Sequence, residues 1–278
     1  MLKKIKAFAK INLFLDIVGK LPNGYHELKS VFQTISLYDE ISITLTDKDV
    51  LVECDVNELV GEDNIVFKAC NAFFEYSGFI GGAHVIIKKN IPIAAGLGGG
   101  SADAAATLLF LNEITGKNFP INELVSIAEK LGADVPFCLY GGTALVEGIG
   151  EKILPISSPE LHFVLLKNGT KQSTGEMYKM LDSIETVKTG DLDKLINGLQ
   201  SGNIKDISDN LYNAFSYCWD FENMTDVFKK YSPLNVFLSG SGPTTVALFK
   251  TQMEAVACFE DLKRKGCEVF CAKSCSRF

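Results

Sequence analysis

Residues 92–105 read Pro-Ile-Ala-Ala-Gly-Leu-Gly-Gly-Gly-Ser-Ala-Asp-Ala-Ala. The four glycines lack a Cβ atom, so the backbone there can take left-handed angles and approach a ligand closely. Ser101 is a good helix N-cap and the alanine-rich run after it is strongly helix-forming, so we predict a helix over residues 101–112. Successive N–H groups then converge where a helix carries about half a positive charge, which predicts a phosphate-binding loop.

Two familiar phosphate-binding loops do not fit this stretch. A Walker A loop requires a lysine directly after its last glycine, where this chain has Ser101. A Rossmann fingerprint requires the spacing G-x-G-x-x-G and an acidic residue on the next strand, whereas Gly96, Gly98 and Gly100 alternate. A flexible surface turn is the plain alternative. Four glycines between a β-rich segment and a strong helix former favour the phosphate loop.

Strand and helix patterns lie on both sides of the loop. Before it, the apolar spacing predicts strands over residues 5–18, 40–45 and 83–89, and a helix over residues 64–76. After it we expect a helix over residues 122–131, stopped by Gly132. Residues 154–159 contain two prolines and two serines and interrupt the pattern, so we place the boundary between two domains here, at 1–156 and 157–278.

The second domain shows a recognisable order of elements. We predict strands over residues 161–167, 235–238, 245–249 and 268–272, and a helix over residues 251–265. With the helices between the first two strands counted as an insertion, this is the β-α-β-β-α-β order of the split βαβ arrangement.

The composition excludes several classes of protein. The 278 residues carry a net charge of −7, which argues against nucleic acid as the main partner. No stretch reaches the roughly 18 apolar residues of a membrane helix, and no N-terminal segment resembles a signal peptide, so we expect a cytoplasmic protein. The eight cysteines lack the short paired spacings of zinc sites. We expect reduced thiols, with redox or metal chemistry at Cys267, Cys271 and Cys275 as the lesser alternative.

The glycine loop resembles the phosphate-binding motif of the GHMP kinases, the superfamily of galactose, homoserine, mevalonate and phosphomevalonate kinases. The superfamily pattern is Gly-Leu, any residue, then Ser-Ser-Ala, whereas this chain has a triple glycine and a single serine. That departure is characteristic of one branch, the kinases that use ATP to phosphorylate the 2-hydroxyl of a cytidine-diphosphate-linked methylerythritol in the non-mevalonate isoprenoid pathway. The resemblance implies an α/β (α+β) two-domain fold, with a domain like ribosomal protein S5 domain 2 followed by a ferredoxin-like domain.

The resemblance also covers the start of the chain, Ala9-Lys-Ile-Asn-Leu-Phe-Leu15. Alone, Lys10 and Asn12 are polar residues alternating within an apolar strand, and a half-exposed strand face would explain them. In the family, Lys10 corresponds to the active-site lysine near the transferring phosphate and Asn12 to a contact with the polyol. Because this motif begins by residue 9, we expect no transit peptide before it.

A second motif, Leu131-Gly-Ala-Asp-Val-Pro-Phe137, supplies the other catalytic candidate. Asp134 follows a predicted helix end and precedes Pro136, so a helix cap is the plain alternative. The resemblance assigns the catalytic aspartate to Asp134.

The resemblance implies a nucleotide site and a bound Mg²⁺, with Ser101 as the residue nearest the metal. The glycine loop of residues 238–244 would close over the phosphates, although a tight hairpin would use the same residues. The implied ATP contacts are Asn64, Lys89, Pro92, Ile93, Ala94, Ala95, Gly96, Leu97, Gly98, Gly99, Gly100, Ser101 and Ala102.

The base of the substrate is expected between aromatic side chains. Tyr25 and His26 follow Gly24 in a turn-like segment, and Thr174 and Tyr178 resemble the opposite wall. The other two histidines, His84 and His162, lie in apolar strands and are expected to be structural. At 168–169 the chain has Asn-Gly where the family usually has Pro-Gly.

The expected partner is therefore a small cytidine-diphosphate polyol, and we expect a monomer or a homodimer. Two rivals stay open. Another GHMP kinase would share the loop but should lack the Tyr25-His26 pair and the opposing Tyr178. A catalytically dead nucleotide-binding regulator should have lost Lys10 or Asp134, and both are present.

Overall fold

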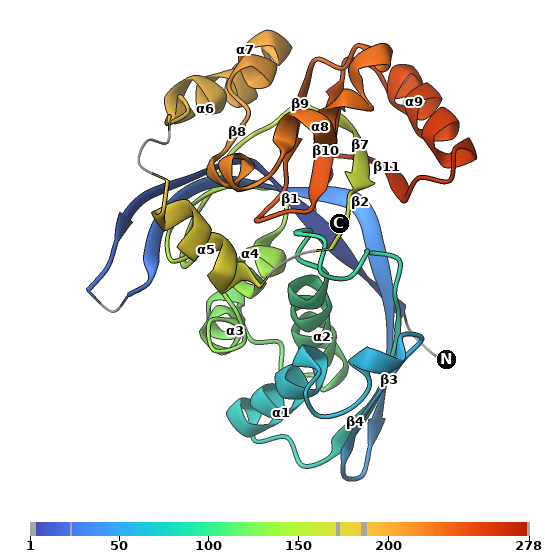
Figure 1. Ribbon diagram of the computed structural model, residues 1–278. Helices are drawn as coiled ribbons and strands as arrows, with labels where there is room; N and C mark the ends of the chain where they lie inside the picture. The colour runs from blue at the N-terminus through green and yellow to red at the C-terminus, as the bar shows by residue number, and fades with distance from the viewer. Residues whose placement is uncertain (1–3, 23, 171–172, 185–187, 277–278) are drawn as a thin grey trace.

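A computed structural model describes residues 4–22, 24–170, 173–184 and 188–276. Residues 1–3, which were considered above for a leader segment, lie outside this part. The chain forms two sheets with helices, as the mixed α/β prediction requires. Figure 1 shows a long two-stranded ribbon, β1 (Lys4–Lys20) and β2 (His26–Thr46), crossing the molecule between the helices α1 to α4 and the C-terminal elements.

The ribbon confirms two predicted strands and corrects the length of the second. The segment 40–45 is only the end of β2, which begins at His26. The alternation of apolar and polar residues did not predict a strand over residues 26–39, because polar side chains are buried there. Ser30, Gln33 and Thr34 are at most 3% exposed. Buried polar side chains of this kind form hydrogen bonds. For example, Thr143 Oγ1 donates to Gln33 Oε1 at 2.6 Å. β2 pairs with β1 on one edge and with other strands on the opposite edge.

The larger sheet grows from this ribbon. Its order is β3-β4-β2-β1-β8, with β5 also on β2 and β6 on β5. β3 runs parallel to β4 and β8 parallel to β1, while the other pairs are antiparallel. The added strands are β3 (Val50–Cys54), β4 (Gly82–Lys88), β5 (Thr143–Gly148), β6 (Lys152–Pro155) and β8 (Tyr212–Asn213).

Helices cover one face of this sheet and enclose a core with it. The three predicted helices are confirmed within about two residues at their starts, and the short helix after Asp134 was not predicted. α2 is buried along most of its length, because its alanine-rich first half and its leucine- and phenylalanine-rich second half are apolar around most of the circumference. The helices are η1 (Asn57–Leu59), α1 (Ile65–Ser77), α2 (Gly99–Ile114), α3 (Ile121–Ala128) and α4 (Val135–Tyr140).

The C-terminal sheet has the order β11-β7-β10-β9, all antiparallel. In chain order its strands therefore lie 4-1-3-2, which confirms the split βαβ prediction. The strands are β7 (His162–Lys167), β9 (Asn235–Leu238), β10 (Thr244–Phe249) and β11 (Val269–Lys273). The helices are α5 (Thr174–Asp182), α6 (Leu192–Ser201), α7 (Ile204–Asp209), η2 (Ala214–Cys218), α8 (Phe221–Asp226), η3 (Lys229–Tyr231) and α9 (Gln252–Arg264).

The two sheets share a hydrophobic core. Ile11 and Leu13 of β1 and Ile35 of β2 pack in one cluster with Phe163 and Leu248 of the C-terminal sheet. Strand β8, from beyond residue 156, pairs with β1 of the larger sheet. A division of the chain at residue 156 therefore stays a proposal. Among the described residues, no helix is long and apolar enough to cross a bilayer.

Candidate active site

The central residue of the site is Lys10, which lies on β1 with its side chain only 5% exposed. Lys10 and Asn12 are two residues apart on a strand, so they share one face of the sheet. The Lys10 ammonium donates to Asn12 Oδ1 at 2.9 Å and lies 4.3 Å from the centre of the Phe32 ring. The half-exposed strand face considered above is thereby excluded. A buried ammonium needs such partners because losing its water is costly.

Asp134 faces this ammonium. Its Oδ2 lies 3.3 Å from Lys10 Nζ, and its side chain is 33% exposed, so the carboxylate is paired and still open to a ligand. Asp134 occupies the N-cap position of α4, yet within the described residues its side chain makes no capping hydrogen bond. The capping alternative is therefore wrong. Lys10 and Asp134 lie far apart in the chain, and the fold brings them together as an ion pair that is open to solvent on the Asp134 side.

The glycine loop lies directly against Lys10. The backbone N–H of Lys10 donates to the Leu97 carbonyl O at 3.0 Å. Gly98, the N-cap of α2, has φ of +67°, and a Cβ there would come within 3.0 Å of Lys10 Cγ. The predicted glycine loop at a helix N-terminus is thus present, and it packs on Lys10 because glycine leaves room there. Its binding of phosphate stays a prediction.

A second glycine loop, residues 239–242, closes the site from the C-terminal sheet. Ser239 Oγ donates to the Gly96 carbonyl O at 3.0 Å, so the two loops touch. The N–H of Gly240 donates to Asn12 Oδ1 at 3.0 Å, and Asn213 Nδ2 donates to the Gly240 carbonyl O at 2.8 Å. Asn12 is fully buried and serves both Lys10 and this loop. Its contact with a polyol stays a prediction.

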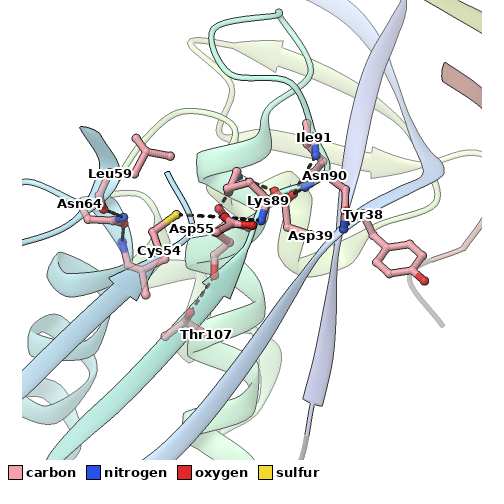
Figure 2. Close-up of polar contacts among 12 residues, drawn as sticks. Tyr38, Asp39, Cys54, Asp55, Leu59, Asn64, Lys89, Asn90, Ile91 and Thr107 are labelled. Carbon is pink, nitrogen blue, oxygen red and sulfur yellow. Dashed lines mark hydrogen bonds and ion pairs between the residues drawn. The ribbon is translucent and has the colours of Figure 1, made fainter. Parts of the chain in front are cut away.

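Lys89 lies behind the glycine loop and not at an open surface. Figure 2 shows its ammonium at the Asp39 carboxylate, and Nζ lies 2.5 Å from Asp39 Oδ2 and 2.7 Å from Asp103 Oδ2. Burial raises the pKa of Asp103, helped by the Asp39 carboxylate and opposed by Lys89. Burial lowers the pKa of Lys89, but the Asp103 and Asp39 carboxylates outweigh it, so the pKa lies above its ordinary value.

Asn64 is the N-cap of α1. Its Oδ1 accepts from the Val66 N–H at 2.8 Å and its Nδ2 donates to the Leu59 carbonyl O at 2.5 Å, as seen in Figure 2. The side chain organises the entrance of α1 near the start of α2. Whether it also touches the nucleotide stays a prediction.

The expected base-binding residues lie at the far end of the ribbon. The rings of His26 and Tyr178 stack with centroids 4.4 Å apart and an interplanar angle of 12°. His26 Nε2 lies 2.7 Å from Asp182 Oδ1, and Lys20 donates to the other oxygen of Asp182. These bonds from Lys20 and His26 hold the pKa of Asp182 below its usual value. Tyr25 is 63% exposed beside this stack.

Tyr178 is the tyrosine of this wall that the fold partly buries. Burial raises the pKa of Tyr178 to about 12, and the Asp134 carboxylate adds to the shift. Thr174 is exposed at the first turn of α5, where Ser173 and Glu176 form the capping box.

Sequence reasoning missed several residues of the site. Asp39, Ser30 and Asn213 carry no local motif and take their roles from partners remote in the chain. Asp182 bonds His26 across 156 residues of sequence. Asp103 could have been singled out, because a carboxylate within the first turns of an otherwise apolar, buried helix must find a cation.

The comparisons with known proteins agree with this geometry. The model of the GHMP kinase N-terminal domain matches residues 64–142, which contain α1, the glycine loop and Asp134. The chain is 39% identical to the 4-diphosphocytidyl-2-C-methyl-D-erythritol kinase of Clostridium beijerinckii over 98% of its own length and 99% of that protein. It is 40% identical to the enzyme of the same name from Clostridium tetani, with the same coverage.

The chain belongs to the 4-diphosphocytidyl-2-C-methyl-D-erythritol kinase family. A crystal structure of a 4-(cytidine 5'-diphospho)-2C-methyl-D-erythritol kinase superposes with a TM-score of 0.81 at 27% identity, covering 98% of this chain and 99% of that one. Homoserine kinase from Cytophaga hutchinsonii superposes with a TM-score of 0.73 at 20% identity, over 99% and 96% of the two chains, and shares the fold. Membership in this kinase family confirms the GHMP fold class and makes the chain an ATP-dependent enzyme.

The contact between the two glycine loops predicts a sharp effect at Gly96. Its φ is +77°, and a Cβ there would overlap the Ser239 carbonyl O and come within 3.0 Å of the Gly242 carbonyl O. Gly202 is the matched control, with φ of +71° and nothing within 4 Å of its Cβ position. Gly202→Ala should cost about 1 kcal/mol from backbone strain alone. Gly96→Ala should cost roughly 2 kcal/mol more and abolish most activity.

Urea unfolding and kcat/KM of both variants measure these effects. Equal losses of stability in the two variants, with full activity in Gly96→Ala, would show that the loops do not depend on this contact.

Proposed function

We propose that this chain transfers the γ-phosphoryl group of ATP to the 2-hydroxyl of 4-diphosphocytidyl-2-C-methyl-D-erythritol, a step of the non-mevalonate isoprenoid pathway. The observation that carries the proposal is the Lys10–Asp134 pair, held at 3.3 Å beside a glycine loop at a helix N-terminus. Phosphoryl transfer needs positioning and charge stabilisation more than covalent chemistry, and this pair with its loop supplies both. The 39% identity to kinases of that name over almost the whole chain supports the choice of substrate.

Asp134 is the proposed general base. Its carboxylate is the partly exposed member of the pair, so it can accept the proton of the acceptor hydroxyl. Lys10 stays buried and paired through the reaction, and its ammonium orients Asp134. The same charge stabilises the transferring phosphoryl group, whose negative charge spreads over its oxygens in the transition state.

The glycine loop of residues 92–102 is the proposed cradle for the β- and γ-phosphates. Its backbone leads into the N-terminus of α2, where N–H groups attract anions. Ser101, in the first turn, is the proposed protein ligand for Mg²⁺, which when bound neutralises phosphate charge. The site fits such a metal, because Mg²⁺ keeps water and phosphate ligands and needs few from the protein. We do not assign Asp103 to the metal, because its side chain is only 5% exposed and is paired with Lys89.

Tyr178 and His26 form the proposed wall for the cytosine ring, with Tyr25 and Thr174 beside it. One face of Tyr178 is stacked on His26, and Asp182 anchors the imidazole through Nε2. A cytosine stacked in this region would present an amine donor and two acceptors to polar groups around it. We further propose a cytoplasmic enzyme that acts as a monomer or homodimer.

An ADP-release assay over four acceptors tests the substrate assignment directly. The acceptors are the cytidine-diphosphate methylerythritol, homoserine, mevalonate and galactose. We expect the cytidine compound to have the highest kcat/KM by at least about 10²-fold, since the others lack a base to bind the aromatic wall. Faster turnover of homoserine, mevalonate or galactose would refute the assignment while leaving the kinase chemistry standing.

Asp134→Asn should lower kcat by about 10²–10⁴ and leave the affinity for ATP nearly unchanged, because the amide cannot accept the hydroxyl proton. Asp226→Asn is the matched control, since Asp226 also pairs with a lysine, at 2.6 Å, but on the exposed helix α8. Steady-state kinetics and circular dichroism of both variants measure the difference. If a folded Asp134→Asn enzyme has the kcat of the control, Asp134 is not the base.

Tyr178→Ala should raise KM for the cytidine substrate by about tenfold or more with no change in KM for ATP, because a base stack is worth roughly 1–3 kcal/mol. Tyr76→Ala is the control, as Tyr76 is an exposed tyrosine on α1 bonded to Glu123. The uridine analogue should lose at least about tenfold in kcat/KM, because exchanged donors and acceptors leave buried groups unpaired. Equal kcat/KM for the cytidine and uridine compounds would show that this wall does not read a base.

A further inference from the structure

Three buried charges meet behind the glycine loop, outside the catalytic pair. They are Asp39 of β2, Lys89 at the end of β4 and Asp103 of α2. The side chains of Asp39, Lys89 and Asp103 are 0%, 6% and 5% exposed, and the ammonium bridges both carboxylates. We name this group the Asp39–Lys89–Asp103 cluster. It ties α2 to the paired strands β2 and β4.

Burying this cluster costs desolvation free energy. Two carboxylates face one ammonium, so its formal charge is −1, and all three groups have lost most of their water. Asp39 is fully engaged, because its Oδ1 also accepts the backbone N–H groups of Asn90 and Ile91 at 2.5 and 2.8 Å. Asp103 is not, because its Oδ1 has no hydrogen-bond partner among the described residues. Replacing such a cluster by hydrophobic residues of similar volume is often neutral or stabilising, so stability alone is a weak explanation for it.

The Asp39–Lys89–Asp103 cluster contacts the chain at both ends of the glycine loop. At its entrance, Asp39 holds the N–H groups of Asn90 and Ile91, directly before Pro92, as Figure 2 shows. At its exit, Asp103 fixes α2 about one turn after the helix begins at Gly99. Lys89 Nζ also lies 3.4 Å from the Cβ position of Gly99, so the ammonium packs directly under the start of the helix.

We propose that the Asp39–Lys89–Asp103 cluster positions the phosphate loop by fixing its entrance and its exit, and that Lys89 acts on ATP only through the two carboxylates. Asp39, Lys89 and Asp103 are therefore positioning residues. The inference rests on the proposed function only in taking residues 92–102 as the ATP phosphate loop. It differs from the expectation drawn from the sequence, in which Lys89 touches the nucleotide. The Lys89 ammonium has three N–H donors, and the two carboxylates accept two of them. The third donor could reach a nucleotide, so an experiment must separate direct binding from positioning.

The substitution Asp103→Leu separates direct nucleotide binding by Lys89 from positioning of the loop, and it leaves no buried charge unpaired. It removes the under-bonded carboxylate and keeps the neutral Lys89–Asp39 pair, so the protein should fold. We expect the Kd for a non-hydrolysable ATP analogue, measured by calorimetry without polyol, to rise about fivefold or more. We expect faster amide hydrogen exchange over residues 92–100 in the same variant. If Lys89 instead binds phosphate, loss of a competing negative charge leaves the Kd unchanged or lowers it, which would overturn the proposal.

A double variant of Lys89 and Asp103 provides the second test. Lys89→Met alone leaves two buried carboxylates without a cation and should lower both the melting temperature and the affinity for the analogue. Lys89→Met/Asp103→Asn returns the cluster to a charge of −1. Because Lys89 is proposed to act through its carboxylates, we expect Lys89→Met to raise the Kd by a smaller factor in the Asp103→Asn background than in the unaltered chain. An equal factor in both backgrounds would assign Lys89 to the nucleotide and refute the proposal.

Lys88→Met is the control for both tests, since Lys88 is the neighbouring lysine, carries the same charge and is exposed. It should bind the analogue like the unaltered chain. Because the measurements use the nucleotide alone, they remain valid if the cytidine substrate is wrong. Failure of the analogue to bind the unaltered chain would instead refute the proposed kinase function.

Discussion

The pairing of β1 with β2 is the constraint on which the rest of the molecule depends. The two strands are hydrogen-bonded from Lys4–Ser42 to Lys20–His26, and their apolar residues enter cores on both sides of the ribbon. A strand buried on both faces has little freedom of register, because a shift by one residue would exchange its core-facing side chains. Lys10, the buried Asn12 and His26 all lie on this ribbon, so their spacing is set by the same hydrogen bonds.

A polar network then joins the two glycine loops across the shared core. Asn12 accepts from the Lys10 ammonium and from the N–H of Gly240, while Ser239 bonds Gly96 directly. These groups are desolvated, so each lost partner would leave a buried donor or acceptor unsatisfied at about 1–3 kcal/mol. The network is thus a strong determinant of geometry even where its net contribution to stability is small. It holds the site between the two sheets in one arrangement before any ligand binds.

The distribution of charge explains how a protein with net charge −7 can bind polyphosphates. Among the described residues, the two lysines that pack against the loop, Lys10 and Lys89, are buried and bound by carboxylates. We therefore expect attraction to phosphate to come largely from the helix N-terminus and from Lys10. Lys10 faces one carboxylate that is partly exposed, whereas Lys89 faces two that are buried. The first arrangement leaves a carboxylate open to a reactant, as the proposed catalytic role requires, and the second leaves none open, as the proposed positioning role requires.

Local patterns in the sequence determined the glycine loop, the helix after it and the C-terminal β-α-β-β-α-β order, because each depends on residues adjacent in the chain. Family motifs also pointed to Lys10 and Asp134. The full length of β2 escaped the pattern because its polar residues are buried by strands on both edges. Only the tertiary structure decided the partners of Lys89 and His26, since Asp39 lies 50 residues from Lys89 and Asp182 lies 156 from His26. A charge is visible in a sequence, but the fold decides which opposite charge it meets.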